Sequence, residues 1–122
     1  MEQIKWKIKA GIEVNLTGED VDDIMCSALE GGICYWCYKA EVVGEYRAEW
    51  AHEQISRGGS LILYHEDGWN DLNIGKLLKG IKRVIADGRL KVTGGRIDGY
   101  DIDGEVADMI VQYAIFDEVI FG

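Results

Sequence analysis

The sequence predicts one α+β domain spanning residues 1–122, built from an antiparallel or mixed sheet with about three to four helices. Residues 4–16 alternate between apolar and polar side chains, which is typical of a strand with one solvated face. Apolar residues between Ile74 and Ile85 instead recur at the helical period. Such segments follow one another without a regular βαβ order, which favours α+β over a doubly wound α/β fold.

The first third of the chain is predicted to form a strand, or a hairpin bent near Gly11, and then a helix. The strand pattern bends near Gly11, and Thr17 followed by acidic residues is typical of a helix N-cap. An apolar stripe over residues 21–29 indicates the buried face of this helix. Gly31 and Gly32 are expected to end it, because glycine adopts the left-handed conformation of a helix C-cap without steric cost.

The middle third is less regular. Residues 33–43 fit both periods, and their β-branched and aromatic content favours an extended segment. Residues 45–56 are predicted to form a helix closed by two glycines, with Tyr46 and Trp50 one turn apart. A short strand at residues 60–65 is expected to end in a turn at residues 66–68.

The last third contains the clearest helical pattern. This helix is predicted to start at Asn70 or Asp71 and to end before Gly88, and Asp103 is expected to cap a final helix. Residues 115–121 are largely apolar, so we expect them to dock either into the core or into another subunit. The second outcome would make the protein a homo-oligomer.

The charge balance limits the classes of partner. The chain has 13 basic and 22 acidic residues and a net charge of −9, which opposes attraction to duplex nucleic acid or to an anionic membrane. A basic protein surface would be attracted instead. No stretch approaches the ~18 apolar residues of a membrane span, and residues 1–5 do not resemble a signal peptide. We therefore expect a cytoplasmic protein without a membrane partner.

Three cysteines, two of them in a C-x-x-C at Cys34 and Cys37, raise the question of metal or redox chemistry. The motif follows the end of a predicted helix, where the helix dipole disfavours a thiolate. A structural zinc needs four ligands, and Cys26, His52 and His65 stand at spacings that match no standard site. The sequence therefore predicts buried apolar cysteines, no metal and no cofactor.

Other catalytic or ion-binding motifs are not supported. The acidic run at residues 98–105 fails as a calcium loop, because Val106 and Gln112 would occupy the positions of the turn glycine and the bidentate glutamate. The glycine pairs lack the spacing of phosphate-binding loops, and no nucleophile elbow is present. No catalytic residue is predicted, and the protein is expected not to be an enzyme.

Aromatic and hydrogen-bonding residues near glycine-rich turns form the candidate ligand-binding set. Aromatic rings supply stacking surfaces, while an arginine and neutral polar groups supply donors for a polar or anionic ligand. The candidates are Glu30, Tyr35, Trp36, Tyr46, Trp50, Gln54, Ser56 and Arg57. The alternative is that the aromatic residues belong to the core and that Arg57 pairs with an acidic side chain.

Five stretches that together span almost the whole chain carry a resemblance to known sequences: residues 23–33, 35–37, 40–44, 52–59 and 109–116. They resemble a family of small uncharacterised proteins from phages and mobile elements of gut bacteria. The resemblance implies a cytoplasmic protein of an accessory genome. It supplies no catalytic or ligand residue, and the family pattern does not require cysteine at position 34.

Small phage proteins without enzyme motifs often act in host takeover or counter-defence, which suggests three hypotheses. The first is a non-enzymatic counter-defence protein that sequesters a nucleotide immune signal. The second is an acidic inhibitor that binds a host defence effector, such as a CRISPR-Cas nuclease. The third is a metal-dependent nucleotide-processing enzyme.

Overall fold

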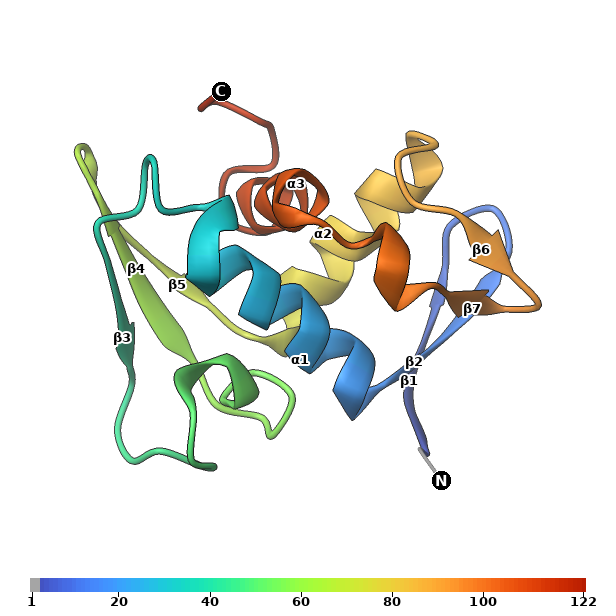
Figure 1. Cartoon of the computed structure of the whole chain (residues 1–122), viewed down its shortest axis with the longest axis horizontal. Coiled ribbons are helices and arrows are strands. Elements are labelled where there is room, and N and C mark those ends of the chain that lie inside the picture. The colour runs from blue at the N-terminus through green and yellow to red at the C-terminus, as the bar shows by residue number, and fades with distance from the viewer. Residues whose placement is uncertain (1–2) are drawn as a thin grey trace.

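Three α-helices lie between antiparallel strands at two ends of the molecule in the computed structural model, which describes residues 3–122 (Figure 1). The helices are α1 (Gly18–Ser27), α2 (Ile74–Ala86) and α3 (Gly104–Phe116). The strands are β1 (Ile4–Lys9), β2 (Glu13–Thr17), β3 (Lys39–Val42), β4 (Leu61–His65), β5 (Gly68–Leu72), β6 (Val92–Thr93) and β7 (Arg96–Ile97). The predicted α+β class is confirmed, whereas Met1 and Glu2 of the predicted domain lie outside the described residues.

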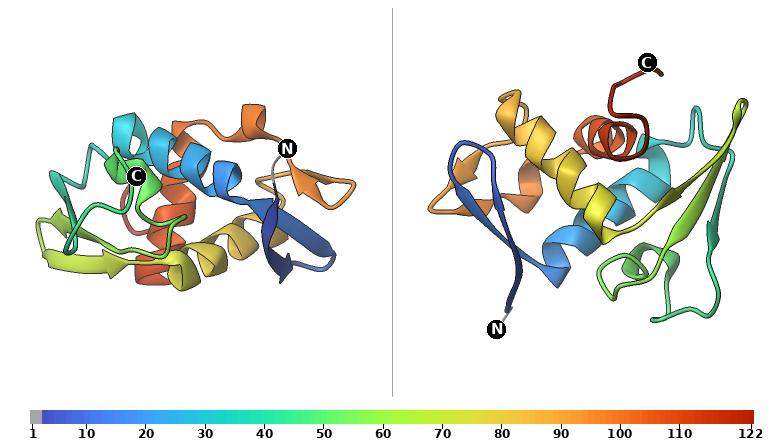
Figure 2. Two further views of the ribbon diagram at one scale, coloured as in Figure 1. Left: turned by 90° about the horizontal axis from the view of Figure 1, so that it is seen from below. Right: turned by 180° about the vertical axis from the view of Figure 1, so that it is seen from behind.

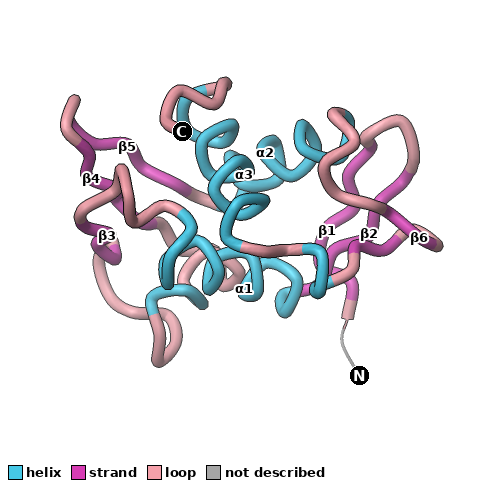
Figure 3. The backbone as a smooth tube through the Cα atoms, turned by 45° about the horizontal axis from the view of Figure 1, so that its top comes forward, coloured by secondary structure: helices cyan, strands magenta, loops and turns pink. Residues whose placement is uncertain are grey.

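The strands form three small sheets rather than one. β3, β4 and β5 make an antiparallel sheet at one end, and the hairpins β1–β2 and β6–β7 lie at the other (Figures 2 and 3). The Asn15 backbone N–H donates to the carbonyl of Gly95 over 2.7 Å and so links the two hairpins. Gly11 adopts a φ of 84° in the turn of the first hairpin, which confirms the predicted bend.

α1 begins as predicted and ends differently. Thr17 accepts from the backbone N–H of Asp20, and the Asp20 carboxylate accepts from that of Thr17, which forms a capping box. A π-helical turn, η1 (Ala28–Gly32), follows α1, and Gly31 is extended at a φ of 176°. The expected left-handed cap is therefore wrong. Gly32 is needed for close approach instead, since a methyl group there would lie 2.6 Å from the carbonyl oxygen of Gly104.

The helix predicted over residues 45–56 is wrong. Only a 3₁₀ turn, η2 (Ala51–Glu53), forms there, and Trp50 before it is extended at φ −117° and ψ 146°. The side-chain amide of Gln54 takes the place of helical hydrogen bonds by accepting from Arg47 N–H and donating to the carbonyl of Glu45. A buried amide that pairs with backbone groups offers the chain a non-helical alternative.

Two further boundaries differ from the prediction. Residues 33–36 form a turn and residues 37–38 are irregular, so only residues 39–42 of the predicted extended segment form a strand. Residues 68–72 form β5, and α2 starts at Ile74 with Asn73 as its N-cap. Tyr64 pairs with Trp69 and His65 pairs with Gly68, and residues 66–67 form the tight turn of this hairpin. Asn70 and Asp71, where the sequence predicts the helix to start, therefore belong to β5.

The core lies where α2 crosses α3. A side chain at Gly80 would collide with the carbonyl of Ile110, so this glycine permits the close approach of the two helices. Asp103 caps α3 by accepting from Val106 N–H, as predicted. After α3 the chain turns at Asp117, which has a φ of 62°, and returns Phe121 to the core. The apolar C-terminus therefore docks within its own chain.

Candidate functional site

The eight predicted ligand residues fall in two separate places. Glu30 and Tyr35 line a groove between η1 and the start of α3, with Trp36 close by. The other five lie in the loop between β3 and β4, residues 43–60. Trp50 and Arg57 line a groove there that shares no lining residue with the first. The structure therefore divides the predicted set into two candidate sites.

The first site, which we call the η1–α3 groove, is open and acidic. Its volume is about 630 Å³, and no lysine, arginine or histidine lines it. The lining residues are Ser27, Glu30, Gly31, Gly32, Tyr35, Gly104, Glu105, Asp108 and Gly122. Three carboxylate side chains without a basic neighbour oppose an anionic ligand at this place.

Asp108 organises the floor of the η1–α3 groove. Its carboxylate accepts from the Tyr35 hydroxyl at 2.5 Å, from the Trp36 indole N–H at 2.7 Å and from the Gln112 amide at 2.9 Å. Desolvation, reinforced by the hydrogen bond to Asp108, raises the pKa of Tyr35 to about 12. The phenol therefore stays protonated and continues to donate at neutral pH.

Trp36 is part of the core rather than a stacking surface. Its side chain is buried, and its ring stacks on Phe121 with the centroids 5.2 Å apart and the planes 5° from parallel. Phe116 and the buried His65 complete an aromatic cluster around it. Neither face of the indole is open to a ligand.

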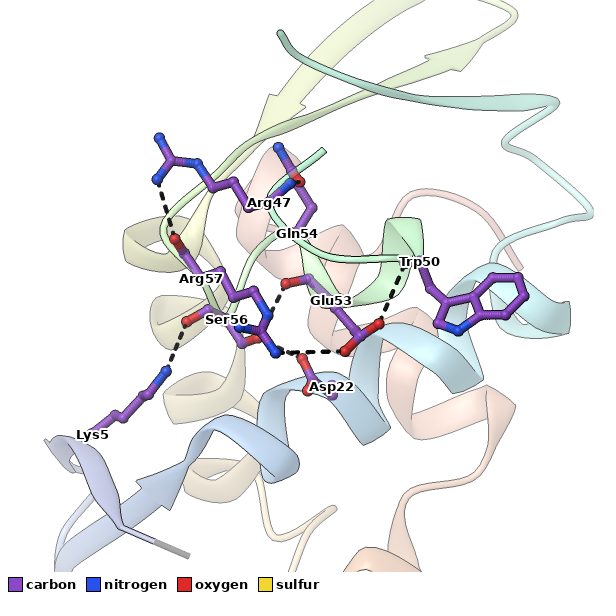
Figure 4. A network of polar contacts seen from close by, with 8 residues as sticks. All are labelled: Lys5, Asp22, Arg47, Trp50, Glu53, Gln54, Ser56 and Arg57. Carbon is purple, nitrogen blue, oxygen red and sulfur yellow. Dashed lines mark hydrogen bonds and ion pairs between the residues drawn. The ribbon is translucent and has the colours of Figure 1, made fainter. Parts of the chain in front are cut away.

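Gln54 and Ser56 are buried beneath the second site and hold its loop in place. Gln54 is fully buried and holds the backbone of residues 45–47, as described above. Ser56 donates to the Asp22 carboxylate of α1 over 2.6 Å (Figure 4). Both side chains form hydrogen bonds within the protein and so position the loop. Contact with a ligand would therefore come from other residues of the loop.

The exposed residues above them form what we call the loop groove. Its volume is about 530 Å³, and its lining residues are Arg47, Ala48, Glu49, Trp50, His52, Glu53 and Arg57. The Trp50 side chain is 57% exposed, and its indole projects away from Glu53 (Figure 4). Glu53 accepts from the Trp50 backbone N–H at 3.3 Å and pairs with Arg57 at 3.8 Å. Tyr46 is exposed on the same loop but does not line the groove.

The loop groove combines an exposed indole with two guanidinium groups that keep hydrogen-bond donors free of short protein contacts. Arg47 makes one long hydrogen bond, 3.4 Å, to the carbonyl of Arg57. Arg57 keeps only a loose ion pair with Glu53, and its side chain is 53% exposed. Guanidinium groups in this state retain donors for a phosphate or carboxylate.

Sequence reasoning missed four residues that define these sites. Arg47 and His52 line the loop groove, while Asp108 and Gln112 organise the η1–α3 groove. Asp108 and Gln112 lie four residues apart on α3, which is otherwise strongly apolar. Two polar residues one turn apart on the buried side of an apolar helix were the sequence signal that could have identified this pair.

The three cysteines are free thiols that differ in exposure. Cys37 is buried, whereas Cys34 is exposed, so the prediction of buried cysteines holds for only one member of the motif. Burial raises the pKa of the Cys37 thiol, which favours the protonated form. Within residues 3–122, no group of three or more His, Cys, Asp or Glu side chains is placed to hold a metal ion. In the same part of the chain, no helix has the length and apolar character needed to cross a bilayer.

Comparisons with protein-family models, with curated proteins and with solved structures find no match to this chain. The phage-protein resemblance of the sequence stays a prediction.

Proposed function

We propose that this chain is a non-enzymatic binding protein that captures a nucleotide in the loop groove. The observation that carries the proposal is the exposed Trp50 beside Arg47 and Arg57 in one groove. An indole offers a stacking surface for a base, and two guanidinium groups offer donors for phosphate oxygens. A nucleotide combines these two features in one molecule.

The scaffold beneath the groove supports capture by a preformed surface. Gln54 and Ser56 hold the loop on the core and on α1, so little ordering entropy is lost when a ligand binds. Glu53 occupies Arg57 at 3.8 Å in the free protein. A phosphate would replace this carboxylate as the partner of Arg57 and form shorter, bidentate hydrogen bonds.

The biological setting of the proposal comes from the sequence. The resemblance to phage and mobile-element proteins makes a nucleotide immune signal of a bacterial host the expected ligand, and the host cytoplasm the expected location. Sequestration requires tight binding without turnover, and the open groove contains no arrangement that we assign to catalysis.

A thermal-shift and calorimetric screen against cyclic and linear nucleotides tests the proposal. A ligand present at 100 times its Kd stabilises a protein by about 2.7 kcal/mol, which raises Tm by several degrees. We expect Trp50→Ala and Arg57→Ala each to weaken binding at least tenfold. If no nucleotide stabilises the wild-type chain at high excess, the proposal is wrong.

Matched controls separate the groove from general surface effects. Arg83 has the same side-chain exposure as Arg57, 54% against 53%, and also pairs with an acidic residue four positions away. Tyr100 is almost fully exposed and distant in sequence from the loop. Arg83→Ala and Tyr100→Ala should bind like the wild type, and equal losses in these variants would contradict a specific groove.

A second candidate function is favoured by the η1–α3 groove. Three carboxylate side chains line it, and the whole chain has a net charge of −9. Such a surface would attract the basic nucleic-acid groove of a host defence effector, for instance a CRISPR-Cas nuclease. Binding to the effector that weakens steeply with salt, and that is lost in Glu30→Lys and Glu105→Lys, would support this candidate. The metal-dependent enzyme hypothesis gains no supporting observation from the described residues.

A further inference from the structure

The sheet β3–β4–β5 has one face that no other element covers. In β4 the side chains of Leu61, Leu63 and His65 are buried, while Ile62 and Tyr64 alternate with them and point outward. The register sets Lys39 and Trp69 beside Tyr64, and Glu41 and Asp71 beside Ile62. Figures 1 and 2 show the helices on one side of this sheet only. We use the name outer sheet face for the six outward-pointing residues, which are Lys39, Glu41, Ile62, Tyr64, Trp69 and Asp71.

Two aromatic side chains, Tyr64 and Trp69, lie on the outer sheet face. Trp69 is 61% exposed, and Tyr38 at the edge of the face is 72% exposed, with its ring 6.3 Å from that of Tyr64. The Lys39 ammonium lies 5.3 Å from the centre of the Tyr64 ring. Exposed tryptophan and tyrosine are costly to leave in water and are enriched at the centres of protein interfaces.

The face, rather than the edge, is suited to contact. β3 is an edge strand of only four residues and presents two charged side chains, Lys39 and Glu41. Short charged edges oppose the addition of a further strand. We therefore consider the broad surface across all three strands, rather than the β3 edge, as the docking surface.

The charges of the outer sheet face are compatible with a second copy of this chain as the occupant. Two chains of net charge −9 repel each other over most of their surface, so a nearly neutral face opposes their association less than the acidic remainder does. The outer sheet face has this property. Lys39 forms an ion pair with Glu41 at 3.1 Å, and Asp71 is neutralised by Lys76 at 2.8 Å.

The arrangement of charges on the face is also self-complementary. Ala40, Leu63 and Asn70 lie at one level across the sheet, with Lys39, Tyr64 and Trp69 one level to one side. Glu41, Ile62 and Asp71 lie one level to the other side. A two-fold axis across the strands at the level of Leu63 exchanges these two rows.

We propose that this chain forms a two-fold dimer in which the outer sheet faces of two copies pack against each other. The axis places Lys39 opposite Glu41 of the second copy and Tyr64 opposite Ile62 of the second copy. It also brings Trp69 opposite Asp71 of the second copy. Facing sheets pack about 10 Å apart, which lets the aromatic side chains fill the space between them. This inference is independent of nucleotide capture, because no residue of the outer sheet face lines the loop groove.

Sedimentation equilibrium tests the dimer directly. At concentrations from roughly 1 µM to 1 mM we expect a transition to twice the 13.7 kDa mass of one chain. Trp69→Ala should raise the dissociation constant at least tenfold, while Tyr100→Ala, which also removes an exposed ring, should leave it unchanged. If the chain stays monomeric throughout this concentration range, the dimer proposal is wrong.

A charge exchange tests the two-fold register. Lys39→Glu and Glu41→Lys each place like charges opposite one another, so each single variant should weaken the dimer at least tenfold. The double variant restores opposite charges and should recover most of the wild-type affinity. Lys82→Glu makes the same charge change on the exposed surface of α2 and should dimerise like the wild type. Circular dichroism verifies that every variant is folded. If both single variants dimerise normally, or if the double variant stays monomeric, this dimer is excluded.

Discussion

Two fully buried glutamines each hold an irregular segment of this protein, and they do so with different results. Gln112 accepts from the backbone N–H groups of Ile120 and Phe121 and so binds the C-terminal segment to α3. Gln54 holds the backbone of residues 45–47 on the β3–β4 loop. The first segment delivers an aromatic ring to the core, whereas the second leaves Trp50 on the surface.

The difference lies in where each glutamine is anchored. Gln112 projects from the middle of a rigid helix and brings together segments that are part of the core. Gln54 belongs to the loop that it organises, so its bonds shape the loop without drawing all of it inward. The same chemical group therefore stabilises the core in one region and fixes the shape of a surface loop in the other.

The largest expected effect comes from Gln112→Ala. The change leaves two part-buried backbone N–H groups without their acceptor and removes one donor from the buried Asp108, so we expect a loss of about 2 to 3 kcal/mol in the free energy of unfolding. Urea denaturation followed by tryptophan fluorescence measures this loss. Gln3→Ala, at an exposed position, is the control and should change stability by less than about 0.5 kcal/mol. Similar values for the two variants would refute the role of Gln112.

A smaller effect is expected for Gln54→Ala. The change frees the backbone of residues 45–47, and we expect a loss of about 2 kcal/mol together with faster proteolysis between residues 44 and 59. Limited proteolysis and denaturation measure the two effects separately. A loss equal to that of Gln112→Ala, without local cleavage, would show that the two glutamines do not differ as described.

The smallest expected effect is the pH dependence contributed by Tyr35. Its pKa is raised from 10.0 to about 12 in the folded protein, so the folded state retains a proton that the unfolded state releases. The resulting stability is complete below about pH 10 and is lost as the pH rises towards 12. Tyr35→Phe should therefore reduce the decline in unfolding free energy between about pH 10 and pH 12. Tyr100→Phe should leave the decline unchanged, and equal slopes for the wild type and Tyr35→Phe would contradict the assignment.

Sequence patterns predicted the regular elements with local signals well and the loop poorly. The hairpin at residues 4–17, the capping box at Thr17 and the cap at Asp103 all depend on residues within a few positions of each other. Residues 45–56 had equally good helical spacing and did not form a helix. A buried amide claimed their backbone groups, and the spacing pattern contains no information on that competition.

The candidate site was predicted residue by residue but not as an assembly. Trp50 and Arg57 do share a groove, while Trp36 belongs to the aromatic cluster of the core. Arg47 and His52 joined the groove although neither stands out in the sequence. Whether an aromatic residue faces the core or the solvent depends on which distant segment covers it.

The sequence by itself determined the α+β class, the N-caps at Thr17 and Asp103, the first hairpin and a net charge of −9. These properties follow from short-range hydrogen bonding, hydrophobic periodicity and composition. Only the tertiary structure decided that the C-terminus returns to Trp36, that Gln54 replaces a helix with a loop, and that the sheet leaves an aromatic face uncovered. Each of these outcomes depends on contacts between residues far apart in the chain or on competition for backbone hydrogen bonds, and neither is encoded in a local pattern.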